Sequence, residues 1–271
     1  MKRKVRPLAL VLLSVVFLIS TVITLSRMYE QHLAKLAYKK AQEAADRIEI
    51  EIIDEETVEE IPLTAEQDIE PLEERAAFLM NVDFNELRNT NDRVLGWIHI
   101  PDSMVDYPLL AVNDNQEYLY RAWDGTKNNA GSIFLECKNQ RDFSDFNTLI
   151  YGHHMKDGSM LANITKYKNA EYWDEHPYVY IVTDDYVRRY TVFSAYEASV
   201  TSDTYRLYFE DDTRKQSAID HYTGSTVVDS EIVPTVEDRI LTLSTCTGNG
   251  TYDTRWVIQA VLDAEFAREI A

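Results

Sequence analysis

The chain has 271 residues, enough for one large domain or two small ones. Its 27 Lys and Arg residues against 46 Asp and Glu give a net charge of −19, and the basic residues cluster only at the extreme N-terminus. A nucleic-acid partner is therefore excluded, because a phosphate backbone needs clustered positive charge.

An apolar segment lies close to the N-terminus. Leu8 to Leu25 carries no charged residue, and as a helix it reaches about 27 Å, nearly the thickness of a hydrocarbon core. Basic residues precede it, namely Lys2, Arg3, Lys4 and Arg6, so the positive-inside rule predicts a cytoplasmic N-terminus and an extracellular remainder. A cleaved signal peptide is the alternative, but the segment is longer than is usual for one and no small-residue cleavage site follows it. We predict a single-pass anchor in the cell membrane.

Two segments of different composition follow this anchor. Residues 27–48 are rich in Ala, Lys, Glu and Leu, with Leu33, Leu36, Ala37 and Ala41 at helical spacings, so the membrane helix is expected to continue outward or to restart. Residues 49–74 contain twelve acidic residues without metal-ligand spacing, which favours a solvated, extended spacer over a metal site. We therefore divide the chain into a cytoplasmic tip and anchor (1–26), an extracellular helical and acidic stalk (27–74) and a catalytic domain (75–271).

The globular part begins with a helix and continues with short strands. Apolar residues from Ala76 to Leu87 share one helical face and predict a helix that ends near Asn91. Strand-like runs bounded by turn residues follow at 94–100, 132–135, 148–151, 178–183, 188–196, 239–244 and 255–262. The long connection after Tyr196 is expected to hold a helix that begins at Asp211 and ends near Gly224. This pattern predicts a mostly β fold, a largely antiparallel barrel or sandwich.

The chain has two cysteines, Cys137 and Cys246. A disulfide between them is one possible use in an external protein. A single bridge rarely supports a domain of this size, and Cys137 is better explained as a small apolar residue at a strand end. Cys246 ends the β-branched run that begins at Thr242, where its thiol is available for chemistry.

Three residue types needed for acyl transfer occur in strand-like contexts. Cys246 supplies a thiol, Arg255 a permanent cation and the pair His153-His154 an imidazole. If the strands before and after the Gly248-Asn249-Gly250 loop pair, Cys246 and Arg255 lie side by side. Because side chains alternate along an extended chain, only one of the two histidines can face the same cleft.

These motifs resemble the sortases, the membrane-bound transpeptidases of Gram-positive bacteria, and class B in particular. The shared segments are Thr242-Leu243-Ser244-Thr245-Cys246 with Arg255, Gly96-Trp97-Ile98-His99-Ile100-Pro101, Asp106-Tyr107-Pro108, Asn129-Ala130-Gly131-Ser132-Ile133-Phe134 and Tyr151-Gly152-His153-His154-Met155. The resemblance implies an eight-stranded sortase-type β-barrel with an N-terminal helix and a helical insertion before the catalytic strand.

The resemblance also implies roles for individual residues. His153, directly after Gly152, is the expected acid and base, with Cys246 as nucleophile and Arg255 as stabiliser of negative charge. Ser244 and Ser159 resemble positions near the class B substrate groove. Thr245, adjacent to Cys246, is expected to orient the substrate or the arginine through its hydroxyl. No acidic residue is singled out as partner of the imidazole, although Asp157 is close in sequence.

The implied reaction is cleavage of an LPxTG-like, or class B NPQTN-like, C-terminal sorting signal after Thr. The acyl group then passes through a thioacyl enzyme to an amine. Transfer to lipid II or a peptidoglycan cross-bridge would anchor secreted surface proteins, whereas transfer to a pilin lysine would build pili. A non-catalytic, membrane-tethered peptide-binding domain is the alternative of another class. No cofactor or metal is expected.

Overall fold

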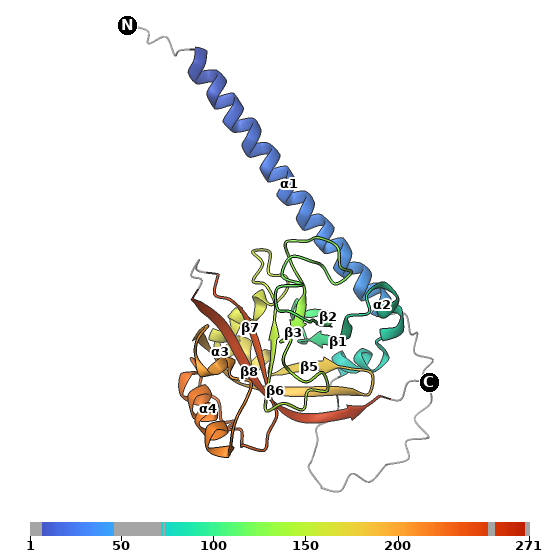
Figure 1. Ribbon diagram of the computed structural model, residues 1–271, viewed down its shortest axis with the longest axis vertical. Helices are drawn as coiled ribbons and strands as arrows, with labels where there is room; N and C mark the ends of the chain where they lie inside the picture. Colours follow the sequence, from blue (N-terminus) through green and yellow to red (C-terminus); the bar gives the residue numbers. More distant parts are fainter. Residues whose placement is uncertain (1–6, 46–71, 73, 249–252, 269–271) are drawn as a thin grey trace.

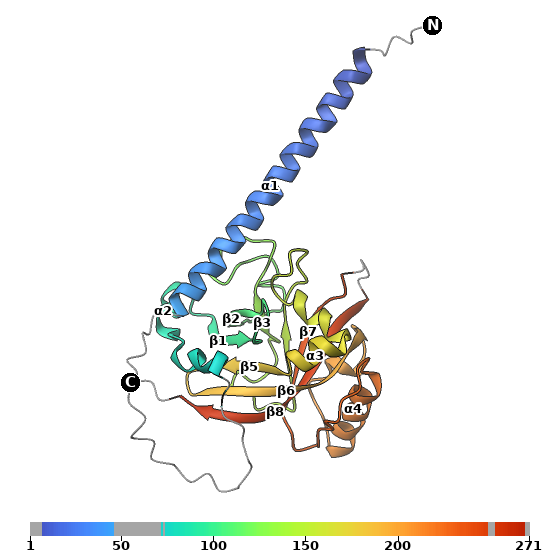
Figure 2. The same cartoon turned by 180° about the vertical axis from the view of Figure 1, so that it is seen from behind.

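The apolar, β-branched runs of the sequence pair into a closed barrel. The structure, a computed structural model, describes residues 7–45, 72, 74–248 and 253–268. Within these residues eight strands close the barrel, and one long helix projects from it (Figures 1 and 2). The predicted mostly β, eight-stranded barrel is confirmed.

The strand order places the ends of the fourth and seventh strands side by side. The strands are β1 (Val94–His99), β2 (Asp106–Ala111), β3 (Ile133–Leu135), β4 (Asn147–Tyr151), β5 (Tyr178–Val182), β6 (Tyr186–Ser199), β7 (Ile240–Cys246) and β8 (Thr254–Ala267). Their order around the barrel is β1-β2-β3-β4-β7-β8-β6-β5, closed by pairing of β1 with β5. Strands β4 and β7 pair in parallel. Parallel strands end at the same edge, so the segment after Tyr151 emerges beside Cys246.

The helices differ from the prediction in two respects. The expected continuous helix after Arg75 is instead a 3-10 helix, η1 (Glu74–Asn81), and a separate α2 (Phe84–Thr90). Asp83 causes the break, because its carboxylate accepts from the backbone N–H groups of Asn85 and Glu86 and so starts a new helix. Strand β2 and two further helical segments, η2 (Ala162–Lys168) and α3 (Ala170–Glu175), were not predicted.

The helical insertion before β7 is confirmed. It comprises η3 (Asp203–Tyr205) and α4 (Asp212–Ser225), and the Asp211 carboxylate caps α4 by accepting from the Arg214 N–H at 2.9 Å. Buried residues of α4, including Ile219 and Tyr222, pack against the outer face of the barrel in a small cluster separate from the main core. The insertion thus covers the outside of the wall that β7 and β8 form.

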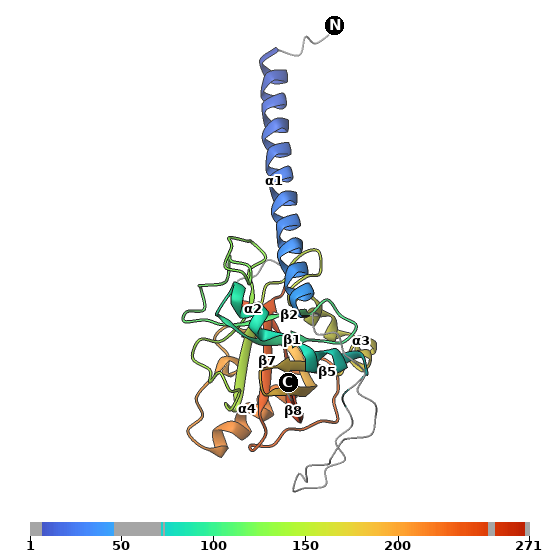
Figure 3. The same ribbon diagram turned by 90° about the vertical axis from the view of Figure 1, so that its right-hand side faces the viewer.

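Helix α1 (Pro7–Ala45) is a single element that leaves the barrel from its upper side (Figures 1 and 3). Its apolar first half is exposed, whereas Tyr38, Ala41 and Ala45 belong to the main hydrophobic core of the barrel. Of the two expected alternatives, a continuing or a restarting helix, the structure has a continuous helix to Ala45, and its last turns pack with the folded domain. The acidic spacer lies almost entirely outside the described residues, so the division at residues 26 and 74 stays a prediction.

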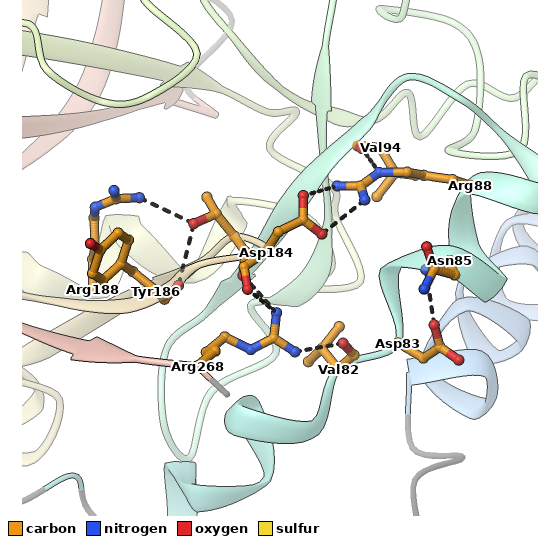
Figure 4. A network of polar contacts seen from close by, with 10 residues as sticks. Val82, Asp83, Asn85, Arg88, Val94, Asp184, Tyr186, Arg188 and Arg268 are labelled. Carbon is orange, nitrogen blue, oxygen red and sulfur yellow. Dashed lines mark hydrogen bonds and ion pairs between the residues drawn. The ribbon is translucent and has the colours of Figure 1, made fainter. Parts of the chain in front are cut away.

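An arginine at the end of β8 fastens three segments together (Figure 4). The Arg268 guanidinium donates to the backbone carbonyls of Val82 at 2.7 Å and Thr183 at 2.6 Å. The neighbouring Asp184 carboxylate accepts two hydrogen bonds from Arg88, at 2.9 and 2.8 Å. These contacts hold η1 and α2 against the β5–β6 turn and the end of β8.

Candidate active site

Cys246 and Arg255 are direct partners across two neighbouring strands. Strands β7 and β8 are antiparallel, and their register pairs Cys246 with Arg255. Directly opposed residues of an antiparallel pair project to the same face. Leu243 and Ile258 of these strands belong to the main core, so the alternation of side chains places Cys246 and Arg255 on the outer face of the barrel wall. The predicted adjacency is therefore confirmed.

His153 reaches the same face from β4. In the parallel pairing, Tyr151 is the partner of Ser244, and His153 follows two residues later, as Cys246 follows Ser244. A cavity of about 650 Å³ on this face is lined by His153, Cys246 and Arg255. The structure thus brings together the thiol, the imidazole and the guanidinium that were predicted from three separate parts of the sequence.

A backbone carbonyl orients the imidazole of His153. Its Nε2 lies 2.7 Å from the carbonyl oxygen of Leu119. A carbonyl oxygen can only accept, so Nε2 carries the proton in this hydrogen bond. The other nitrogen, Nδ1, then has a lone pair in the neutral ring and can take up a second proton. The group that orients the histidine is this carbonyl, and Asp157 bonds instead with Ser159 and pairs with Lys35.

His154 points elsewhere. Its backbone forms an isolated bridge with Met160, and its ring lies against Gly248, where a Cβ would stand only 2.9 Å from Cε1. His154 is not among the residues that line the cavity around Cys246. Alternation along the extended segment therefore separates the two histidines as expected.

The three predicted substrate residues have different surroundings. Ser244 and Thr245 line the cavity, but both are buried and their hydroxyl groups are bonded within the protein. The Ser244 hydroxyl lies 2.9 Å from the hydroxyl of Tyr205, and Thr245 donates to the Gly152 carbonyl at 2.8 Å, which ties β7 to the segment that carries the histidine. Ser159 lies away from this group, in a cavity between α1 and the barrel.

The cavity also contains residues that the sequence did not single out. Tyr205, from the helical insertion, lies beside Ser244. Burial raises the pKa of Tyr205, although the Ser244 hydrogen bond and the positive charge of Arg255 oppose this effect. The buried carboxylate of Glu136 accepts from Asn115 at 2.6 Å and from the Tyr151 hydroxyl at 3.0 Å. No sequence motif marks these residues, because their proximity depends on loops that lack regular periodicity.

Both cysteines are free thiols, so the alternative disulfide is not formed. Cys137 lines the same cavity as Cys246. Burial and the hydrogen bond that its thiol donates to the Glu136 carboxylate raise the pKa of Cys137. Cys137 is therefore held in the protonated, less nucleophilic form. Among the described residues, no group of three or more His, Cys, Asp and Glu side chains could hold a metal ion.

Comparison with known proteins identifies the family. The family model described as the sortase domain matches residues 98–263. The chain belongs to the sortase family. Sortase B of Listeria monocytogenes is 35% identical over 183 residues, which cover 66% of this chain and 74% of that protein. Sortase B of Staphylococcus aureus is 31% identical over 163 residues, covering 60% of this chain and 67% of the relative.

Solved sortase B structures share the fold. A structure described as a Staphylococcus aureus sortase B–substrate complex has a TM-score of 0.63 at 29% identity and covers 66% of this chain and 84% of that one. Sortase B from B. anthracis has a TM-score of 0.68 at 26% identity, and the match covers 87% of this chain and 98% of that one. The resemblance to class B is thereby confirmed, and the sortase is an enzyme of the cysteine transpeptidase type.

Proposed function

We propose that this sortase is anchored in the cell membrane, cleaves a C-terminal sorting signal of the LPxTG or NPQTN kind after Thr, and transfers the acyl group to an amine. The observation that carries the proposal is the cavity that His153, Cys246 and Arg255 share on one face of the barrel. Each of these side chains has a distinct role in the reaction.

Cys246 is the nucleophile. Its thiolate attacks the carbonyl carbon that follows the Thr side chain, and the carbonyl oxygen becomes negatively charged. Arg255 lies on the same face of the adjacent strand. Its guanidinium is permanently charged and presents a planar set of donors, which suits stabilisation of both the thiolate and the developing oxyanion.

His153 moves the proton. In its cationic form, the imidazole gives the Nδ1 proton to the departing amine when the carbon–nitrogen bond breaks, which leaves the acyl group on the Cys246 sulfur. The incoming amine then attacks this thioester and loses a proton to the neutral Nδ1, and the thiolate is released. The Leu119 carbonyl holds Nε2 throughout, so that the same nitrogen performs both transfers.

Helix α1 supplies the membrane anchor. Its first half is apolar and exposed, with Phe17 72% and Leu13 66% accessible. One stretch of this helix is long and apolar enough to cross a bilayer. Figures 1 and 2 show that α1 leaves the upper end of the folded domain from beside α2, whereas β8 begins at the opposite edge of that end. Anchoring would concentrate the enzyme with a membrane-held secreted substrate and with a lipid-linked amine acceptor.

The biological role that we propose is attachment of secreted proteins to the cell wall, with the amine of lipid II or of a peptidoglycan cross-bridge as the acceptor. Pilin polymerisation uses the same acyl-enzyme but a lysine side chain as acceptor. Presenting the acyl-enzyme with a short amino-terminal peptide and with a lysine-containing peptide compares the two directly. Preferential product formation with the lysine peptide would replace cell-wall anchoring by pilus assembly as the proposed role.

The test of the activity is hydroxamate formation. The purified full-length chain is incubated with a panel of sorting-signal peptides and hydroxylamine, and hydroxamate products are measured. We expect the product with at least one signal and none with Cys246→Ala, whose thermal unfolding stays near that of the wild type because this side chain is only half-buried. A chain that binds the peptides without yielding hydroxamate would instead be a binding domain.

A further inference from the structure

The end of α1 contacts the segment that frames the proposed catalytic histidine. Tyr38 is only 7% exposed, and its hydroxyl donates to the carbonyl of Gly131. From the same segment, the indole N–H of Trp123 donates to the Ala37 carbonyl at 2.8 Å. The segment from Trp123 to Gly131 is therefore hydrogen-bonded to α1 at both of its ends.

Gly131 itself lies against His153. Its φ of +60° is in the left-handed region that favours glycine. A Cβ at this position would stand 2.6 Å from the Leu119 carbonyl oxygen and 2.8 Å from Cδ2 of the His153 ring. The backbone that Tyr38 holds thus packs both on the imidazole and on the carbonyl that accepts its Nε2 hydrogen bond.

A second path leads from the same tyrosine to the histidine backbone. The rings of Tyr38 and Tyr107 meet edge to face, with centroids 5.1 Å apart. The Tyr107 hydroxyl accepts from the Met160 N–H at 3.1 Å, and the next residue, Leu161, donates its N–H to the His153 carbonyl at 3.0 Å. Both the ring and the backbone of His153 are consequently supported by side chains that touch α1.

We infer that the extracellular end of α1 is a positioning element for the imidazole of His153, acting through Tyr38 and Gly131. This inference rests on the proposed role of His153 in proton transfer. Cys246 and Arg255 are held by the pairing of β7 with β8, to which α1 does not contribute. Loss of the Tyr38 contact should therefore affect proton donation to the leaving group more than attack by the thiolate.

Two substrates with different leaving groups separate these steps. Both carry the same acyl peptide, one joined through the natural amide and the other through a thioester. An amine must be protonated to leave, whereas a thiolate leaves near neutral pH without a proton. In the detergent-solubilised full-length chain, acylation of Cys246 is followed in single-turnover experiments, because release of the acyl group also uses His153 and is common to both substrates. We expect Tyr38→Phe to lower the saturating acylation rate with the amide about tenfold at an unchanged half-saturating concentration, and to alter the acylation rate with the thioester by less than twofold.

Tyr29→Phe is the matched control, because Tyr29 lies on the same helix but is 64% exposed. It should turn over both substrates at wild-type rates. Trp123→Phe breaks the contact from the other side and should reproduce the selective loss of amide cleavage. This variant decides the matter if Tyr38→Phe does not fold in a thermal unfolding assay.

His153→Ala distinguishes failure of the inference from failure of the proposed function. It should slow acylation by the amide far more than acylation by the thioester. If it does so while the folded Tyr38→Phe variant, or Trp123→Phe in its place, retains full amide activity or loses both activities equally, the positioning role of α1 is wrong. If His153→Ala does not discriminate between the substrates, the proton-transfer role assigned to His153 is wrong, and the inference is overturned with it.

Discussion

At the scale of single residues, the proposed role of Arg255 depends on the planar geometry of its guanidinium. A guanidinium offers several donors in one plane, whereas an ammonium is a compact point charge on a flexible stem. Arg255→Lys keeps the charge opposite Cys246 but loses the planar geometry. We expect kcat/KM to fall about 100-fold or more, the size typical of a lost oxyanion donor. Peptide cleavage at saturating and limiting substrate measures this, and a loss of less than threefold would exclude the oxyanion role.

The two adjacent histidines provide an internal comparison. His153 lines the cavity with Cys246, and His154 lies against Gly248. We expect His153→Ala to reduce the rate of amide cleavage about 100-fold or more, in line with general acid–base catalysis, and His154→Ala to reduce it much less. Steady-state cleavage of one sorting-signal peptide ranks the two variants. The reverse ranking would reassign the proton transfer to His154.

The side chains that we propose to react could be predicted from the sequence, but the groups that support them could not. The residue types of Cys246 and Arg255 indicate their chemistry, and their strand contexts predict that they share a face. His153 was chosen over His154 from the resemblance to the sortases. The acceptor that orients His153 is a backbone carbonyl, that of Leu119. Every residue has such a carbonyl, so no residue type marks it. Ser159 was expected at the groove from the resemblance to class B sortases, but it lies in a turn that lines the cavity beside α1.

At the scale of secondary structure elements, Arg268 is expected to stabilise the joint between β8 and the N-terminal helices. Its guanidinium donates to three backbone carbonyls in two segments, those of Met80 and Val82 and that of Thr183. Arg268→Met would leave those carbonyls without the charged donor, which should lower the free energy of unfolding by about 2–4 kcal/mol. Urea unfolding of the full-length chain in detergent measures the change. An effect below 0.5 kcal/mol, about the size seen at ordinary surface positions, would show that the network adds no stability.

The strand pattern was more predictable than the helices. Strand-like runs bounded by turn residues located β1, β3, β4, β5, β6, β7 and β8, because short apolar stretches between turn residues are typical of strands. The periodicity of residues 76–87 predicted one helix, but hydrogen bonds to the Asp83 carboxylate divide it. Strand β2 contains Pro108, a residue unusual in a sheet. Its parallel pairing with β3 depends on residues far apart in the sequence.

At the scale of the whole molecule, α1 combines a proposed membrane span with a docked end. The sequence indicated a helix beyond the apolar segment, and Ala37 and Ala41 lie on its buried face. What the sequence could not show is that these small residues allow the helix to approach the barrel closely. The side chain of Tyr38 then reaches the segment around His153. A single element thus links the proposed anchor to the active site.

The anchoring proposal can be tested with charges placed in the apolar half of α1. Leu13→Arg combined with Phe17→Arg should move the chain from the membrane to the soluble fraction, because each arginine near the centre of a span costs about 2.5–3.5 kcal/mol. Cell fractionation followed by an alkaline wash measures the distribution. Replacing the same two residues by Ile is the control. Retention of the arginine variant in the washed membrane would contradict a transmembrane role for α1.

The central claim is that the acyl group is carried by Cys246. The most direct measurement is mass spectrometry of the chain mixed with a cleavable sorting-signal peptide, quenched in acid and mapped by proteolysis. Two free thiols, Cys137 and Cys246, line the cavity, so the peptide map shows directly which of them carries the acyl group. We expect the acyl fragment on Cys246 alone and its removal by hydroxylamine. An acyl group on Cys137, or turnover of the peptide by Cys246→Ala, would contradict this account.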